Sequence, residues 1–93
     1  MSGEPEEPFR LPITDELDLH TFRPRDVGPL VEDWVEEAWQ AGFRLLRIIH
    51  GKGSGQLREK VHSVLRKHPR VLDFRLGGDR GGGWGATVVR LRE

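Results

Sequence analysis

The sequence predicts an α/β fold in which both helices cover one face of a four-stranded mixed sheet. Segments typical of strands alternate with segments typical of helices in the order β-α-β-α-β-β. The two strand–helix–strand units are long enough for crossover connections between parallel strands, which places both helices on the same face. Ninety-three residues fit one small domain, with a modest core.

The N-terminal part of the chain divides into a tail and the start of the domain. Residues 1–12 are rich in Glu and Pro and contain a single aromatic residue, so we expect a flexible acidic tail before a single domain at 13–93. Residues 16–20 then alternate between apolar and polar side chains and are bounded by turn formers. This alternation predicts a short first strand.

A helix is expected next. Pro24 and Pro29 suit its first turns, where a missing N–H costs little, and Gly42 suits its C-terminal end. Between them an apolar stripe recurs at helical spacing, with acidic residues on the other face. The stripe consists of Val27, Leu30, Val31, Trp34, Val35 and Ala38.

The middle of the chain predicts a strand followed by a second helix. The run at 43–49 is almost continuously apolar, which is typical of a strand buried on both faces. Ser54 is the expected N-cap of a helix that continues to about His68 and ends before Pro69. This helix is basic, and we expect His62 and His68 to lie on its solvated surface.

Two strands close the expected fold, at 71–76 and 86–91, with a glycine-rich loop at 77–85 between them. Trp84 lies in that loop among glycines. An aromatic ring on such a loop can stack on a nucleic-acid base, and the alternative is that it covers the edge of the core.

Charge is distributed unevenly along the chain. The net charge is zero, but residues 1–40 carry 11 acids and 3 bases, and residues 41–70 carry 8 bases and 1 acid. This asymmetry indicates a polyanionic partner, or else two oppositely charged helix faces that pair with each other.

Several classes of protein are excluded. The chain has no cysteine, so disulfides and thiolate metal sites are excluded. No apolar run approaches the roughly 18 residues of a membrane span, and the N-terminus does not resemble a signal peptide. We therefore expect a cytoplasmic protein without a membrane partner.

The segment HGKGSG at 50–55 is the first candidate site. Loops that leave the C-terminal ends of strands carry the ligand sites of open α/β sheets. Glycines let the backbone approach a ligand, the N–H groups that open the next helix favour an anion, and Lys52 adds a positive charge. The pattern favours a phosphate site. The alternative is a tight strand-to-helix turn.

Asp18 and His20 form the second candidate site. They lie two apart on a strand and therefore share a face, with His20 at the strand end. His20 can act as a general acid or base, oriented by Asp18. Alternatively, Asp18 accepts backbone hydrogen bonds at the next helix start and His20 is a half-buried packing residue.

Four separated motifs resemble the Smr (small MutS-related) domain family: LDLH at 17–20, IIHGKGSG at 48–55, HPRV at 68–71 and GATVVRL at 85–91. The resemblance implies an α/β two-layer sandwich similar to the C-terminal domain of translation initiation factor three. It also implies binding to structured RNA or branched DNA and, as in several members, a structure-selective nicking endonuclease. We expect a stand-alone module of this family.

The resemblance assigns roles to particular residues. LDLH implies cleavage by Asp18 and His20, with His50 assisting. The second motif and its surroundings imply nucleic-acid or phosphate contacts, for which the expected residues are Gly51, Lys52, Gly53, Ser54, Gly55, Arg58 and Trp84. The family often has glycine after LDLH, whereas Thr21 and Phe22 follow here and make a bulkier turn beside His20.

The expected cofactor depends on the substrate. RNA carries its own 2′-hydroxyl nucleophile and needs no metal, whereas cleavage of DNA requires a divalent cation, Mg²⁺ or Mn²⁺, near Asp18. Two other functions fit the same residues. One is an RNA-binding module without catalysis, and the other is a domain that holds a small nucleotide or phosphate on the glycine loop.

Overall fold

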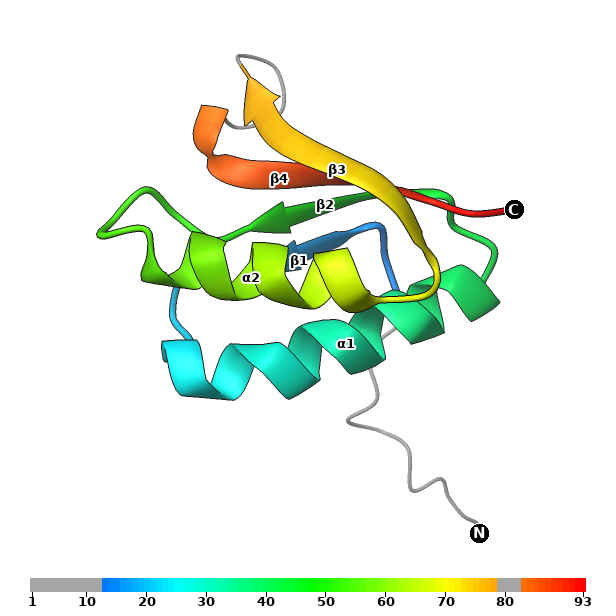
Figure 1. Cartoon of the computed structure of the whole chain (residues 1–93), viewed down its shortest axis with the longest axis horizontal. Helices are drawn as coiled ribbons and strands as arrows, with labels where there is room; N and C mark the ends of the chain where they lie inside the picture. The colour runs from blue at the N-terminus through cyan, green and yellow to red at the C-terminus, as the bar shows by residue number, and fades with distance from the viewer. Residues whose placement is uncertain (1–12, 79–82) are drawn as a thin grey trace, which may run out of the picture.

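Two layers make up the part of the protein that the computed structural model describes, residues 13–78 and 83–93. One layer is a four-stranded sheet, and both helices lie together on one side of it (Figure 1). The expected tail at 1–12 lies outside the described residues. In chain order the elements are β1 (Glu16–Asp18), α1 (Pro24–Gln40), β2 (Leu45–Ile49), α2 (Gln56–Lys67), β3 (Val71–Gly78) and β4 (Gly83–Leu91).

The sheet is mixed, with strand order β1-β2-β4-β3. β1 and β2 are parallel, and Leu17 pairs with Ile48. β4 is antiparallel to both β2 and β3 and lies between them, so that Thr87 is opposite Ile48 on one side and Leu76 on the other. The predicted order of elements and the mixed sheet are confirmed. The last strand pairs with β2 along the whole length of β2, from Leu45 opposite Arg90 to Ile49 opposite Ala86.

The two candidate sites lie at the same edge of the sheet. Because β1 and β2 are parallel, the loops that follow them leave the sheet at one end, on the left in Figure 1. These loops connect β1 to α1 and β2 to α2. Segments about thirty positions apart in the sequence therefore meet.

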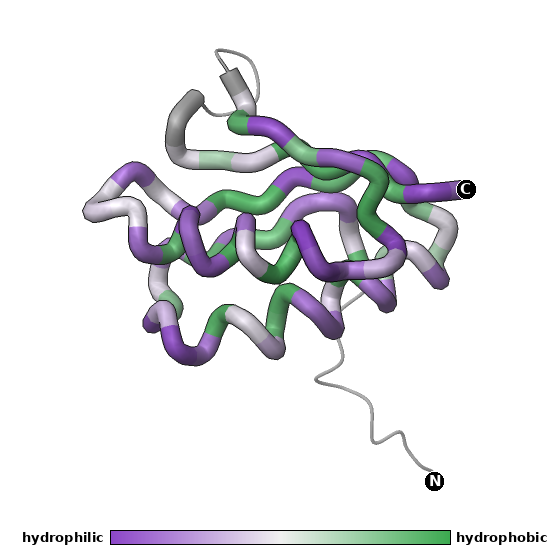
Figure 2. The backbone as a smooth tube through the Cα atoms, viewed as in Figure 1, coloured by the Kyte–Doolittle hydropathy of each residue, from purple (hydrophilic) through white to green (hydrophobic). Residues whose placement is uncertain are grey.

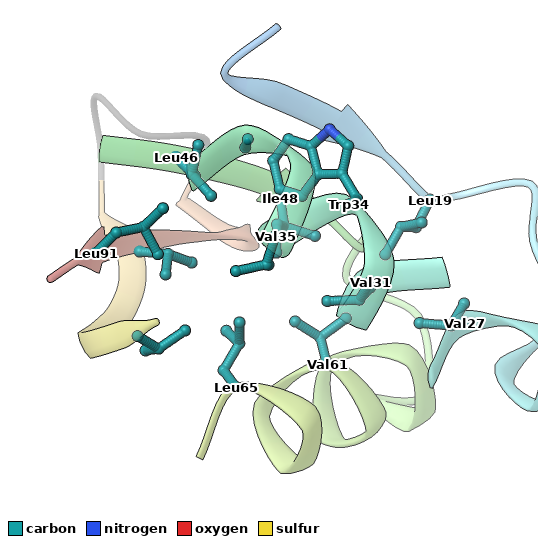
Figure 3. Packing of buried hydrophobic residues seen from close by; sticks show 13 residues of the cluster. Leu19, Val27, Val31, Trp34, Val35, Leu46, Ile48, Val61, Leu65 and Leu91 are labelled. Atoms are coloured by element: carbon teal, nitrogen blue, oxygen red, sulfur yellow. The ribbon is translucent and has the colours of Figure 1, made fainter. Parts of the chain in front are cut away.

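The core lies between the helices and the sheet. Figure 3 shows apolar side chains from both helices and from the strands converging on one cluster, and Figure 2 shows apolar positions recurring along β2 and α1. Val31, Val35, Ile48 and Val61 are fully buried. Each such side chain contributes about 1.5–3 kcal/mol through the hydrophobic effect.

The expectation that the second strand is buried on both faces was wrong. β2 begins at Leu45, whose exposed fraction is 58%, whereas Leu46 and Ile48 are buried. Successive side chains of a strand point to opposite faces, and the helices cover only one of them. The apolar run therefore includes residues of the uncovered face.

The start of α2 also differs from the prediction. Its N-cap is Gly55, with φ at +89°, and the Ser54 hydroxyl lies 3.4 Å from the backbone nitrogen of Gln56 without capping the helix. A positive φ is readily adopted only by glycine. The expected end of α1 is confirmed, since Gly42 follows the C-cap with φ at +100°.

The last two strands are longer than predicted. β3 continues through Gly78 and β4 begins at Gly83, and these two residues pair across the ladder. Most of the expected loop at 77–85 is therefore strand, and residues 79–82 lie outside the described residues. Glycine is unfavourable in a strand, but it does not exclude one.

Candidate active site and phosphate-binding loop

A pocket of about 340 Å³ lies where the loops after β1 and β2 meet. His20 and Phe22 form one wall, and Gly51, Gly53 and Arg58 are among the residues that form the other. The pocket thus joins the two candidate sites that the sequence could only place separately.

The first wall is organised around a contact between Asp18 and His20. Asp18 Oδ1 lies 2.6 Å from Nδ1 of His20 and 3.0 Å from its backbone nitrogen. The hydrogen bond from the imidazole is the main cause that lowers the pKa of Asp18 below its usual value. The carboxylate therefore accepts, Nδ1 donates, and Nε2 has no protein partner among the described residues.

The exposure of His20 tests the alternative in which it is a packing residue. Its side chain is 63% exposed, and the ring stands at the pocket despite the bulkier Thr21-Phe22 turn. The N-cap of α1 is Arg23, and no side chain caps that helix. Asp18 therefore orients His20 and does not cap α1.

The second wall is the glycine loop. Gly51 and Gly55 have φ values of +81° and +89°, which L side chains rarely adopt. The backbone nitrogens of His50 and Gly51 both donate to the carbonyl of Gly85 at 2.9 Å. An added Cβ on Gly85 would lie 3.6 Å from Gly51 Cα, so β4 approaches the loop closely.

The two basic residues of the expected phosphate site lie in different places. Arg58 lines the pocket, and its guanidinium lies beside Gly55, where an added Cβ would come within 2.9 Å of Nη2. Lys52 is exposed and is not among the residues that line the pocket, although its Cγ would lie 3.5 Å from a Cβ added at Gly85. Ser54 lines the pocket together with the glycines.

His50 lies at the pocket but is almost fully buried, with 3% exposure. Its Nδ1 lies 3.0 Å from the carbonyl oxygen of Gly51, and its Nε2 lies 2.8 Å from the hydroxyl of Thr87. Burial is the main cause that lowers its pKa below the usual value. Because both ring nitrogens are engaged, the geometry suits His50 to supporting the loop.

Three residues at this site were not predicted from the sequence: His62, Gly85 and Thr87. The expectation that His62 and His68 lie on a solvated surface was wrong. His62 is half-buried and bonds Thr87, and His68 is 8% exposed and donates to the carbonyl of Glu32. The sequence does contain a signal for Thr87. It lies two positions before Val89 in a strand, so both side chains point to the same buried face.

Two further expectations concern Trp84 and a divalent metal ion. The backbone of Trp84 belongs to β4, and its side chain lies outside the described residues. Within 13–78 and 83–93, no group of three or more His, Cys, Asp or Glu side chains could hold a metal ion. Asp18 offers one carboxylate, and Mg²⁺ is commonly held by one or two carboxylates together with phosphate oxygens and water.

The fold and the site define a small α/β domain that presents an aspartate–histidine pair and a glycine loop at one edge of its sheet. The family model of the Smr domain matches residues 17–92. The chain belongs to this family, which confirms the resemblance seen in its motifs. In the described residues, no helix is long and apolar enough to cross a bilayer.

Several relatives of this chain are much longer proteins. The chain is 44% identical over 80 residues to endonuclease MutS2 of Halalkalibacterium halodurans, and 36% identical over 80 residues to endonuclease MutS2 of Clostridium tetani. Each match covers 86% of this chain and 10% of the relative. The chain thus spans about a tenth of the length of these relatives.

Solved structures match most of this chain. The Smr domain of Thermus thermophilus MutS2 has a TM-score of 0.80 at 38% identity, and the match covers 86% of this chain and 100% of that one. YdaL, a stand-alone small MutS-related protein from Escherichia coli, has a TM-score of 0.80 at 27% identity, over 88% of this chain and 67% of YdaL. Both confirm the fold.

Proposed function

We propose that this Smr domain binds structured RNA or branched DNA and nicks it, with His20 as the acid–base residue. The observation that carries the proposal is the 2.6 Å contact that orients His20 on the wall of a pocket shared with the glycine loop and Arg58. The relatives named endonuclease MutS2 support this class of activity.

The second wall of the pocket suits a phosphate of the backbone. The loop at 51–55 leads directly into α2, whose first N–H groups and dipole favour an anion. Arg58 adds a fixed positive charge that can donate two hydrogen bonds to phosphate oxygens. Lys52, an exposed residue of the same loop, adds attraction for a neighbouring phosphate.

Phe22 supplies an apolar surface next to His20. It is 42% exposed although it is large and apolar, and it lines the pocket. An exposed aromatic ring beside a phosphate site can stack on a base without reading its sequence. Phe22 is therefore proposed to hold the nucleotide next to the scissile bond, which suits recognition of structure over sequence.

With RNA, the reaction needs one proton acceptor at the 2′-hydroxyl. Nε2 of His20 accepts that proton as the 2′-oxygen attacks phosphorus, and the 5′-oxygen leaves with a proton from solvent. The products are a 2′,3′-cyclic phosphate and a 5′-hydroxyl. Asp18 holds the ring through Nδ1 and stabilises the imidazolium, while Arg58 and the loop N–H groups offset the charge on the phosphate.

With DNA, water must be the nucleophile because the 2′-hydroxyl is absent. Mg²⁺ or Mn²⁺ held by Asp18 and by phosphate oxygens would supply a more acidic water and neutralise phosphate charge. His20 then exchanges a proton with water or with the leaving oxygen.

The deciding experiment is a cleavage assay with the purified protein on branched DNA and structured RNA, with Mg²⁺, with Mn²⁺ and with a chelator. We expect cleavage of at least one substrate, and metal-independent cleavage only for RNA. Binding without cleavage under every condition would support the RNA-binding module instead. Binding of mononucleotides alone would support a nucleotide-binding domain.

A further inference from the structure

Three side chains, from β4, from α2 and from His50 directly after β2, form a hydrogen-bonded chain next to the glycine loop. The hydroxyl of Thr87 on β4 lies 2.8 Å from Nε2 of His50 and 2.8 Å from Nε2 of His62 on α2. Thr87 is fully buried, and His62 packs on the ring of Phe74 at 4.8 Å. The chain ends at the carbonyl of Gly51, 3.0 Å from Nδ1 of His50.

The chemistry of these groups fixes the direction of every hydrogen bond in the chain. A carbonyl oxygen only accepts, so Nδ1 of His50 carries the proton. Nε2 of a neutral His50 is then an acceptor, so the Thr87 hydroxyl donates to it. The Thr87 oxygen in turn accepts from Nε2 of His62, which carries the proton there.

Both histidines are neutral near pH 7, as this direction requires. Burial is the main cause that lowers the pKa of each ring below the usual value. Neighbouring groups also act on His62: His50, Arg66 and Arg58 lower its pKa, and Glu59 raises it. Arg58 also lowers the pKa of His50.

The hydrogen bond from His50 to the Gly51 carbonyl determines how the loop presents its backbone. The peptide bond after Gly51 is trans, since the described residues contain no cis peptide, and its C=O and N–H therefore point in opposite directions. A Gly51 carbonyl held toward the buried His50 ring directs the N–H of Lys52 away from that ring. The same loop is fixed to β4 through the Gly85 carbonyl.

We propose that Thr87 and His62 are positioning residues, which fix the tautomer of His50 and thereby orient the Gly51–Lys52 peptide for binding a phosphodiester. This inference rests on the proposed function. It gives His50 a supporting role and explains why a hydroxyl is buried between two imidazoles. A merely structural role for Thr87 would require only a side chain of its size.

The test combines a ligand-free measurement with a binding measurement. Imidazole ¹⁵N NMR of the wild-type protein should show His50 protonated at Nδ1 and His62 protonated at Nε2 near pH 7. Thr87→Val keeps the shape but removes the hydroxyl that donates to Nε2, so the Nδ1-protonated tautomer of His50 should keep only its bond to the Gly51 carbonyl and become less dominant. Affinity for a short phosphodiester oligonucleotide should fall by about three- to tenfold, the range expected for one misdirected hydrogen bond.

Two further variants separate positioning from packing. Thr87→Ser retains the hydroxyl and should restore both the tautomer and the affinity. His62→Phe leaves Thr87 able to donate to His50, so it should reduce affinity less than Thr87→Val. Thermal unfolding of each variant shows which effects come from loss of fold.

The outcomes distinguish this inference from the proposed function. His50 protonated at Nε2 in the wild type, or an unchanged affinity in folded Thr87→Val, would overturn the positioning role. A wild-type protein that binds no oligonucleotide would contradict the proposed function. The tautomers, which are measured without ligand, would still decide the hydrogen-bonded chain.

Discussion

Oδ1 of Asp18 accepts two hydrogen bonds from one residue, His20: one from Nδ1 at 2.6 Å and one from the backbone nitrogen at 3.0 Å. The backbone bond fixes the turn that ends β1, and the side-chain bond fixes the ring on that turn. Nε2, which has no protein partner among the described residues, is thus left available on a side chain that is 63% exposed. Such an arrangement serves proton transfer better than packing.

His20→Ala should abolish nicking while leaving nucleic-acid affinity almost unchanged. A residue that transfers a proton acts mainly in the transition state, and its loss typically lowers the rate by about 10²–10⁴-fold. The measurement is single-turnover cleavage alongside equilibrium binding. Asp18→Asn should lower the rate as well, because the amide can present an N–H to the ring and cannot stabilise the imidazolium.

Thermal unfolding is the control for these variants. His20 is 63% exposed, so truncation removes little buried surface and the Tm should change little. Parallel losses of activity, affinity and Tm in His20→Ala would contradict the proton-transfer role.

Arg58→Ala should weaken binding to all nucleic-acid sequences alike and reduce its salt dependence. Loss of one phosphate contact lowers the slope of log K against log salt by about 0.9 for a duplex or 0.7 for a single strand. Arg66→Ala is the matched control, because Arg66 is an exposed arginine about 12 Å further along α2 and away from the pocket. Equal effects of the two substitutions would place the binding face elsewhere.

The order of the elements could be predicted because each carries a local periodic signal. The apolar stripe of α1, with Val31 and Val35, and the alternation at 16–20 depend only on neighbouring residues. The exposure of Leu45 could not be predicted this way. Whether a second layer covers the other face of the sheet is a property of the whole topology.

The candidate site shows the same limit. Asp18, His20 and the loop at 50–55 are visible as motifs, but Thr87 and His62 are not, because they act through contacts 37 and 25 positions apart in the sequence. The insertion of β4 beside β2 creates these contacts. Ser54 was mistaken for the N-cap because residue type does not reveal the positive φ of Gly55.

Stability should fall as the pH decreases below about 6.5. The folded-state pKa values of His50 and His62 are lowered from their usual value of 6.5, mainly by burial. The unfolded chain therefore binds more protons than the folded one in this range. The contribution of the two histidines to the free energy of unfolding is complete above pH 6.5 and is lost as the pH falls toward their folded-state pKa values.

Urea unfolding between pH 8 and pH 5 measures this dependence. His62→Gln removes one of the two groups and can still donate to Thr87, so its stability should change less with pH than that of the wild type. A free energy of unfolding that is constant across this range would contradict the assignment of the buried His50 and the half-buried His62 as neutral.

The last prediction distinguishes a phosphate-binding loop from a tight turn by comparing two glycines of the same loop. Gly55 has a positive φ, and an added Cβ would press on the guanidinium of Arg58 at 2.9 Å. Gly53 has no positive φ, and an added Cβ would meet nothing within 4 Å, yet Gly53 lines the pocket. Gly55→Ala should therefore lower the free energy of unfolding by about 1–2 kcal/mol.

Gly53→Ala should leave stability unchanged and still weaken nucleic-acid binding, because its methyl group would occupy space that a phosphate needs for close approach to the backbone. Urea unfolding and equilibrium binding of the two variants give the comparison. If Gly53→Ala binds RNA and DNA as well as the wild type, the glycine is not retained for a ligand. The segment would then be a turn that connects β2 to α2, and the phosphate site would have to lie elsewhere on the domain.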